Sequence, residues 1–433
     1  MEENSPKPVY RELKSPVTAQ MALTYGCNNL CRYCYNSTRG LENQDKGMSI
    51  ENSMKMAKQI VDNEIFEVVL TGGEPLLRRD LLYPLAEYFS QKKTDVKMNS
   101  NLVLITYDDT QKIKDSGILS VFGSLSSFDE ATYNYITQTK NHSKAIKGLE
   151  TLIQAGIPTG INMVVTDLNK DQVYETGEFL HKLGIKAFCA TPASACEYMN
   201  PELELSTKDV VKTLDALLEL QNDFGMSVDV VEPIPRCIVE NSQKYEQFFR
   251  RDCAAGKMTI SIDPDGDVTP CTHVSKKYGN LLRESLEEVW KRMDEWRDGS
   301  FVPKKCYPCA ELDICSLGCR EAGKIKEGSH NSPYPWSQEP LQKNRRIPEI
   351  HFIKDNKTLK IPDKIKYRKE GKDYAVYCSN THSVILINQD FFDLVKDLYS
   401  RESFTIKNLT EELGDKNMVK NTINFLNTRG LIC

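Results

Sequence analysis

The sequence predicts an α/β fold, a partial barrel of six strand–helix units built on a parallel sheet. Two observations predict it. Six short strand-like segments alternate with segments of helical length in the first half of the chain. The longer segments carry apolar residues at positions i, i+3 and i+4, so each can cover the sheet with one face. In a fold of this kind the chemistry lies at the carboxyl ends of the strands.

The predicted elements follow one another regularly along the chain. The strands are residues 17–24, 66–71, 96–99, 120–124, 159–165 and 185–190. The helices between them include residues 49–62, 80–91, 143–155 and 171–183. Two of these helices run into Gly156 and Gly184, and glycine favours the left-handed conformation that ends many helices. A longer helix is predicted over residues 207–224.

Changes in sequence texture divide the chain into five expected parts. These are an N-terminal segment (1–16), the partial barrel (17–230), a cysteine-rich domain (231–335), a linker (336–364) and a small α+β domain (365–433). In the small domain we expect strands at 367–368, 374–378 and 384–387, then amphipathic helices at 390–399, 405–413 and 418–428.

Composition excludes several classes of protein. Of the 433 residues, 40% are hydrophobic and 27% are charged, which is an ordinary globular balance. The net charge of −5 argues against a protein that mainly binds nucleic acid. No apolar run approaches the roughly 20 residues that span a bilayer, and the first residues contain no apolar signal segment. We therefore expect a cytoplasmic protein without nucleic-acid or membrane partners.

Cysteine is the unusual feature of the composition. The chain has 14 cysteines, more than packing requires. Disulfides are rare in a reducing compartment, so clustered cysteines there indicate metal or redox chemistry.

The first cysteine group lies directly after the first predicted strand. Cys27, Cys31 and Cys34 are separated by three and then two residues, so one loop can offer three thiolates to a cubane iron–sulfur cluster. No fourth cysteine is near, which would leave one iron open to a substrate or cofactor. A zinc loop or three structural cysteines are the alternatives, although a closed structural zinc site needs a fourth donor.

The second motif ends the strand predicted at 66–71. Gly72 and Gly73 allow the backbone to approach a ligand, and the carboxylate of Glu74 can accept from an ammonium group. Pro75 completes a Gly-Gly-Glu-Pro turn. This turn alone is a weak signal. Because it stands one strand–helix unit after the cysteine loop, the two motifs together are a strong one.

With both motifs in place, residues 17–195 resemble the radical S-adenosylmethionine (SAM) superfamily. Cys27, Cys31 and Cys34 match its CxxxCxxC signature, and Tyr33 occupies the usual aromatic position before the third cysteine. The 72–75 turn matches the element that holds the methionine amino group of SAM in that superfamily, so Gly72, Gly73 and Glu74 are expected cofactor contacts.

The same resemblance extends to three later segments. Residues Asn99, Ser100 and Asn101 stand at a ribose-contacting strand end, with Leu102 in place of the usual glycine. Asn99 and Ser100 are the expected contacts there, and Ser124 matches a serine of another such strand. Residues 136–138 lie where many relatives carry an arginine that meets the SAM carboxylate, and this chain has none there.

The resemblance implies a definite chemistry. A reduced 4Fe-4S cluster gives one electron to SAM bound at its open iron. The products are methionine and a 5′-deoxyadenosyl radical, which abstracts hydrogen from an unactivated C–H bond. An electron donor such as flavodoxin or ferredoxin is then required as a partner. The cofactor carries the difficult step, so the protein needs no Ser/His/Asp triad.

The later cysteines resemble the SPASM extension, which holds auxiliary iron–sulfur clusters. The resemblance implies a nearer cysteine set (Cys253, Cys271 and Cys319) and a farther cysteine set (Cys306, Cys309 and Cys315), for one or two auxiliary 4Fe-4S clusters. By spacing alone the run from Cys306 to Cys319 also fits a zinc ribbon. Thr272 stands where sulfatase maturases carry an aspartate, which counts against that activity.

The farther set departs from the family pattern, because the expected seventh cysteine is replaced by a stretch that begins Ser332-Pro333. A fourth ligand from His330, one from the remote Cys378 or Cys433, and an open iron are the alternatives. Three other cysteines match no motif, and we expect them to be small buried residues; they are Cys189, Cys196 and Cys237. Cys237 remains an option for the nearer set.

Residues 365–433 resemble the winged-helix-like PqqD module, the recognition element for ribosomally synthesised and post-translationally modified peptides (RiPPs). Such modules bind a leader peptide as an extra strand at a sheet edge. A generic interaction domain is the alternative.

These parts together predict a cytoplasmic radical SAM/SPASM oxidoreductase that installs an oxidative cross-link, a thioether or a C–C or C–O bond, in a ribosomally made precursor peptide. A radical SAM enzyme acting on a folded protein or a small metabolite is the first alternative, and a non-enzymatic zinc protein is the second.

Overall fold

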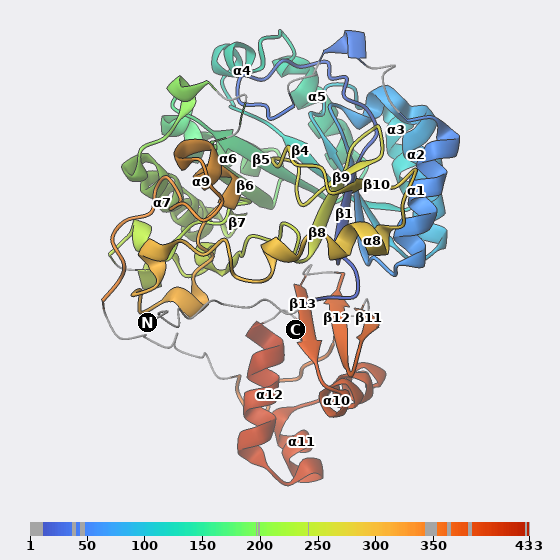
Figure 1. Cartoon of the computed structure of the whole chain (residues 1–433), viewed down its shortest axis with the longest axis vertical. Coiled ribbons are helices and arrows are strands. Elements are labelled where there is room, and N and C mark those ends of the chain that lie inside the picture. Colours follow the sequence, from blue (N-terminus) through green and yellow to red (C-terminus); the bar gives the residue numbers. More distant parts are fainter. Residues whose placement is uncertain are drawn as a thin grey trace. The chain divides into compact units, whose positions relative to one another are not determined.

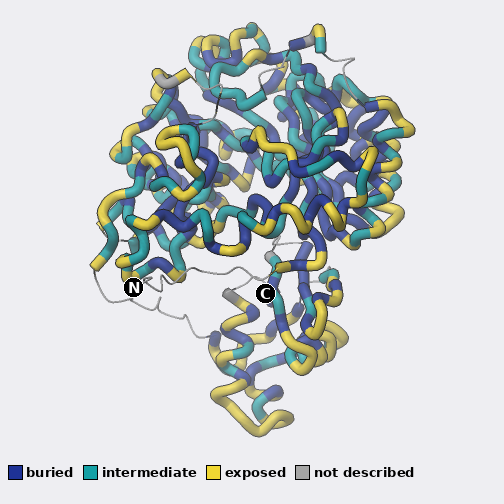
Figure 2. The backbone as a smooth tube through the Cα atoms, in the orientation of Figure 1, coloured by how far each residue is buried: buried dark blue, intermediate teal, exposed yellow. Residues whose placement is uncertain are grey.

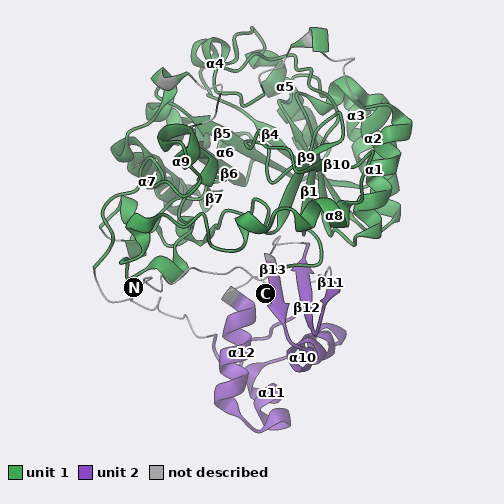
Figure 3. Cartoon of the chain, viewed as in Figure 1, with its two compact units in different colours: residues 1–345 green, residues 346–433 purple. Residues whose placement is uncertain are grey.

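A computed structural model of the chain divides it into two compact units, residues 1–345 and 346–433 (Figure 3). The structure describes residues 12–36, 40–43, 48–195, 197, 200–240, 242–342, 353–361, 365–379, 383–428 and 431–432. Cys196, Cys433 and part of the expected linker lie outside the described residues.

The first unit is built on a mostly parallel sheet of ten strands, which confirms the predicted α/β fold class. Strands β1 to β7 are neighbours in chain order and run parallel. They are β1 (Thr18–Ala22), β2 (Glu67–Thr71), β3 (Asp95–Ser100), β4 (Ile118–Ser124), β5 (Thr159–Val165), β6 (Ala187–Pro192) and β7 (Ser227–Asp229). The six predicted strands are all present, and β7 is an additional one.

The cysteine-rich region continues the same sheet. Strand β8 (Thr259–Ile262) pairs parallel with β1, on the side away from β2. Strands β9 (Asp267–Thr269) and β10 (Gly279–Asn280) then extend the sheet in antiparallel fashion. The predicted boundary near residue 230 therefore does not interrupt the sheet.

Helices lie around this sheet, as Figure 1 shows. They are α1 (Ile50–Asp62), α2 (Arg79–Gln91), α3 (Tyr107–Asp115), α4 (Glu130–Thr137), α5 (His142–Gln154), α6 (Val173–Lys182), α7 (Thr207–Phe224), α8 (Leu286–Lys291) and α9 (Arg320–Glu327). Capping residues explain where several of these helices begin. Ser49 caps α1. The pairs Thr106/Asp109 and Ser206/Asp209 form capping boxes on α3 and α7. Among the described helices, none is long and apolar enough to cross a membrane.

Alternate residues of the central strands form the core of the first unit, and Figure 2 shows how burial follows the strands. Ala19 and Met21 of β1 and Val68 and Leu70 of β2 are fully buried. Because side chains alternate along a strand, the residues between them face the other side of the sheet. This pattern fixes the register of the sheet, and with it the height at which each strand ends.

Leu102, just after β3, is held in an unusual conformation by two glycines. Its φ of +70° lies in the left-handed region that favours glycine, which is the residue type expected at this position from the superfamily pattern. A Cβ on Gly123 would lie 2.8 Å from a Leu102 methyl carbon, and a Cβ on Gly148 would lie 2.1 Å from the Leu102 carbonyl oxygen. The absent side chains make room for buried Leu102.

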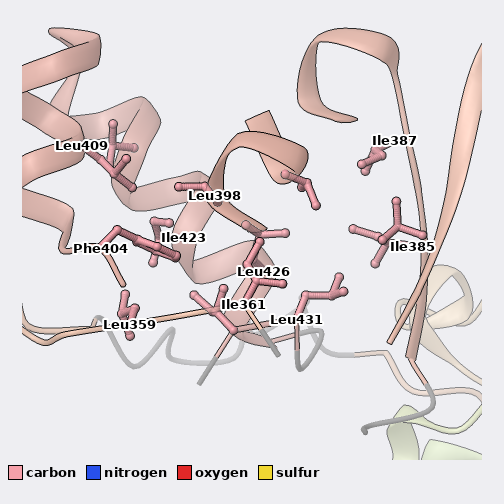
Figure 4. Packing of buried hydrophobic residues seen from close by; sticks show 14 of the residues in the cluster. Leu359, Ile361, Ile385, Ile387, Leu398, Phe404, Leu409, Ile423, Leu426 and Leu431 are labelled. Carbon is pink, nitrogen blue, oxygen red and sulfur yellow. The ribbon is translucent and has the colours of Figure 1, made fainter. Parts of the chain in front are cut away.

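The second unit is the predicted small α+β domain. Strands β11 (Ile365–Glu370), β12 (Asp373–Cys378) and β13 (Ser383–Ile387) form an antiparallel sheet with β12 at its centre. Helices α10 (Gln389–Ser400), α11 (Ile406–Leu413) and α12 (Lys416–Thr428) follow. Leu398, Phe404, Leu426 and other apolar side chains form its own core (Figure 4).

Gly148→Ala should destabilise the first unit, because the new methyl group would meet the Leu102 carbonyl oxygen. Overpacking costs about 1–3 kcal/mol, and the better helix propensity of alanine offsets about 0.5–1 kcal/mol of this. We expect the free energy of unfolding to fall by about 1–2 kcal/mol in denaturant titrations, given the difference between these two effects. Lys147→Ala, at an exposed position of the same helix, is the matched control and should change little. Equal stabilities of the two variants would contradict the packing argument.

Candidate functional site

The first cysteine loop leaves β1 and is anchored to the end of α4. Cys27, Cys31 and Cys34 are partly buried and form no disulfide. Leu30 N–H donates to the Thr137 carbonyl (2.9 Å) and Arg32 N–H to the Ile136 carbonyl (3.0 Å). Residues 136 and 137, where the superfamily pattern has a carboxylate-binding arginine, thus hold the loop through their backbone. The amide N–H of Cys34 donates to the carbonyl of Cys31, which closes the tight turn between the last two cysteines.

The glycine turn after β2 is locked to the start of this loop. Gly73 N–H donates to the Thr24 carbonyl (2.8 Å), and Glu74 N–H donates to the Gly26 carbonyl (2.9 Å). A Cβ on Gly73 would lie 2.0 Å from the Gly26 oxygen, so only glycine allows the two backbones to come this close. The two motifs found separately in the sequence are therefore one structural element.

Glu74 is fully buried and joins β2 to the end of β3. Its carboxylate accepts hydrogen bonds from the Ser100 hydroxyl (2.9 Å), Asn101 N–H (2.8 Å) and Leu76 N–H (3.2 Å). Burial raises the pKa of Glu74 to about 7, although these hydrogen bonds act in the opposite direction. A carboxylate has about four acceptor positions, so one remains for a ligand.

Asn101 belongs to the strand end that the superfamily pattern places at the ribose, although only Asn99 and Ser100 of that segment were expected as cofactor contacts. Its side-chain amide donates to the side-chain oxygen Oδ1 of Asn28 (2.8 Å) and approaches Cys27 Sγ at 3.6 Å. Asn29 N–H lies 3.4 Å from the same sulfur. Burial and then Glu74 raise the pKa of Cys27 to about 12, and the two asparagines act in the lowering direction. The signal in the sequence for Asn101 was its position directly after Asn99 and Ser100.

The remaining expected cofactor contacts are spread along the same strand ends. Ser124 is the last residue of β4 and is half-buried, and Asn99 lies near the end of β3. The hydroxyl group of Tyr33 lies 3.0 Å from the Ser126 hydroxyl, which links the cysteine loop to the segment after β4. Gly72 has a φ of +140° at the end of β2.

These residues fit the cluster and the cofactor that the motifs imply. The cysteine loop after β1, the buried Glu74 carboxylate after β2 and the backbone of Asn101 after β3 lie together at the carboxyl ends of these strands. The buried side-chain nitrogen of Asn28, beside them, has no hydrogen-bond partner. Within the described residues, no three His, Cys, Asp or Glu donors meet at the spacing of a single metal ion. In a cubane, each thiolate binds a different iron.

The nearer cysteine set is brought together and lies beside the first loop. Burial and then the neighbouring Cys253 raise the pKa of Cys271 to about 12. Burial also raises the pKa of Cys319, and Glu232, then Cys253 and Cys271, raise it further. The rings of Tyr35 and His273 lie 5.1 Å apart, which joins the segment after Cys34 to the segment after Cys271.

The farther cysteine set lines a recess of about 450 Å³, counted with the open solvent at its mouth. Cys306, Cys309 and Cys315 pack there against Val302, Leu312 and Leu317. Cys237 lines the same recess, which differs from its expected role as an unrelated buried residue or a member of the nearer set.

His330 is engaged elsewhere. Its Nε2 lies 2.6 Å from a carboxylate oxygen of Glu321, and its ring packs against Trp296 and Phe301. It does not line the recess of the farther set. Cys378 belongs to the second unit, where it is part of the core.

Comparison with known proteins agrees with this geometry. The radical SAM superfamily matches residues 21–180, and the SPASM iron–sulfur cluster-binding domain matches residues 253–316. Mycofactocin maturase MftC from Mycolicibacterium smegmatis is 25% identical over 357 residues, covering 78% of this chain and 88% of that protein. AdoMet-dependent heme synthase from Methanosarcina barkeri is 24% identical, covering 72% and 94%.

A solved structure shares the fold. Streptococcus suis SuiB bound to its precursor peptide SuiA superposes with a TM-score of 0.60 at 20% identity, covering 76% of this chain and 77% of that one. The zinc-protein alternative is therefore wrong. The chain is a radical SAM enzyme that uses SAM, a 4Fe-4S cluster and auxiliary SPASM iron–sulfur clusters, and its relatives include a mycofactocin maturase and a heme synthase.

Proposed function

We propose that this enzyme modifies a ribosomally made precursor peptide and installs an oxidative cross-link in it, a thioether or a C–C or C–O bond. The observation that carries the proposal is the separate C-terminal unit attached to a radical SAM/SPASM enzyme. Its three-stranded sheet has two edge strands, β11 and β13, at which an extended peptide can add as a further strand.

The relatives support a peptide substrate. MftC is a maturase, and SuiB binds a precursor peptide. The heme synthase relative favours a second candidate, a small-molecule substrate, because it matches this chain over a comparable length. The C-terminal unit is the feature that favours the peptide.

We assign Cys27, Cys31 and Cys34 to the initiating cluster, with Gly72, Gly73, Glu74, Asn99, Ser100, Ser124 and Tyr33 around SAM. A 4Fe-4S cluster held by these cysteines would supply, when reduced, the electron for cleavage of bound SAM. The residues of this chain position the reactants: Glu74 accepts the ammonium group, and the locked glycine turn holds the backbone beside it. The carbonyl of Gly26 is already used by Glu74 N–H, which keeps the loop in register during turnover.

We assign the nearer and farther cysteine sets to auxiliary clusters that accept an electron from the oxidised substrate. A cross-link removes two hydrogen atoms, and hydrogen abstraction removes only one hydrogen atom with its electron. The second hydrogen leaves as a proton and an electron. The proton passes to a basic group or to solvent, and the electron needs an acceptor, which an auxiliary cluster would supply. A flavodoxin or ferredoxin is the proposed external donor.

The test of function uses a peptide encoded by a short open reading frame beside this gene. Co-expressed with the enzyme, the peptide should lose two hydrogen atoms per cross-link by mass spectrometry. Cys27→Ala should abolish both this change and the release of 5′-deoxyadenosine on reduction. Cys189→Ala, on β6 and outside the proposed site, should retain both. Deoxyadenosine release without any peptide modification would favour the small-molecule alternative.

Glu74→Gln should weaken SAM binding, because it removes the negative charge and presents an amide to three hydrogen-bond donors. We expect a loss of about tenfold or more in affinity, equivalent to about 1.4 kcal/mol, by equilibrium binding to the cluster-loaded enzyme. Glu87→Gln, at an exposed position of α2, is the control.

The pH dependence gives an independent check of the same residue. Because the pKa of Glu74 is raised to about 7, lowering the pH through 7 protonates it and should weaken SAM binding to the wild type. SAM binding to the Glu74→Gln variant should not weaken in this way as the pH falls through 7. Identical pH profiles would show that Glu74 does not meet the ammonium group.

Precursor peptide should slow amide hydrogen exchange in one edge strand of the second unit, β11 or β13. Strand β12 already pairs on both sides and serves as the internal control. A peptide with a scrambled leader should give no protection. Protection confined to residues 12–342 would place leader recognition outside the second unit.

A further inference from the structure

Four thiols from two distant segments line one recess of the first unit. Cys306, Cys309 and Cys315 come from consecutive turns, and Cys237 comes from a 3-10 turn, Arg236–Ile238, far earlier in the chain. All four are outside disulfides and half-buried.

Hydrogen bonds and an ion pair fix the Cys237 turn against the farther cysteine set. The guanidinium of Arg236 is buried and contacts Glu311 at 2.7 Å, within the segment between Cys309 and Cys315. The backbone of Arg236 also acts on the pKa of the Cys315 thiol, in the lowering direction, which places the two segments next to each other. Cys237 is therefore held beside the set by its immediate neighbour.

The sulfur of Cys237 is itself arranged as an acceptor. Gln338 N–H lies 3.3 Å from Cys237 Sγ, and Leu317 N–H lies 3.5 Å from Cys315 Sγ. N–H groups directed at sulfur are typical of cluster thiolates, whose potential they tune. Burial raises the pKa of Cys237 to about 11, and the nearby Cys315 and Cys309 act in the same direction, so the sulfurs interact.

We propose that Cys237 is the fourth thiolate of the farther auxiliary cluster and completes its coordination. This inference rests on the proposed assignment of Cys306, Cys309 and Cys315. Four cysteines are the usual ligand set of a 4Fe-4S cluster. A fully coordinated cluster offers no iron to a substrate, so the farther cluster carries electrons only.

The other ligands considered from the sequence are less well placed. His330 is bonded to Glu321 and lies outside the recess. Cys189 lies on β6 near Asp229 and Arg251, away from the farther set. Among the cysteines that match no family motif and lie in the described part of the first unit, Cys237 is the one that lines the recess.

The test measures clusters rather than turnover. In a full-length chain carrying Cys27→Ala, Cys31→Ala and Cys34→Ala, only the auxiliary clusters remain. After anaerobic reconstitution, adding Cys237→Ala should lower bound iron and sulfide by about four each per chain. Where the cubane persists, its electron paramagnetic resonance signal should instead change on addition of a small thiol, because one iron has become open. Cys189→Ala and His330→Ala in the same background are the controls.

Cys237→Ser provides a second variant, in which a weaker oxygen ligand should retain the cubane but shift its midpoint potential. Iron, sulfide and resonance signals equal to those of Cys189→Ala in both Cys237 variants would overturn the proposal. One zinc ion per chain in place of iron at this site would also overturn it. None of these readouts depends on a peptide, so a wrong substrate assignment would leave the result intact.

Discussion

The close approach of two backbones, at Gly26 and Gly73, is the constraint on which the site depends. Two amide hydrogen bonds join the loop after β1 to the turn after β2, and a single added carbon atom at Gly73 would prevent them. Because adjacent parallel strands end at the same height, the three thiols and Glu74 are brought to one edge of the sheet. The chemistry therefore relies on the register of β1 and β2 rather than on any long-range loop.

Strand β1 also positions the auxiliary region, because β8 pairs along its other side. The Tyr25 hydroxyl donates to Asp265 (2.9 Å), and Tyr35 packs on His273, so both ends of the first cysteine loop contact the segment that carries Cys271. A single strand is thus shared by the two cluster regions. The change in sequence texture suggested a separate domain for the cysteine-rich part. In the structure that part continues the sheet of the first unit.

Most of the features of the fold and the site that could be predicted from the sequence depend on residues that are close together in the chain. The cysteine loop, the glycine turn and the six βα units depend on local spacing and periodicity, and the structure has them. The role of residues 136 and 137 as backbone anchors, the pairing of β8 with β1 and the position of Cys237 depend on contacts between distant segments. Leu102 shows a further limit: its left-handed conformation requires Gly123 and Gly148, which no local pattern connects to it.

Arg320 gives a physical reason for the two auxiliary sets to act together. Its guanidinium is buried and donates to backbone carbonyls, among them that of Ser332 at 3.0 Å, while burial lowers its pKa. Those carbonyls do not neutralise a full charge, and a buried charge needs compensation. Thiolates supply it, because Cys253 and Cys319 of the nearer set and Cys306 and Cys315 of the farther set all favour its charged form. One cation thus stabilises negative charge on both sets. Since cluster potentials depend on net charge, a cation beside both sets would raise the potentials of both clusters together.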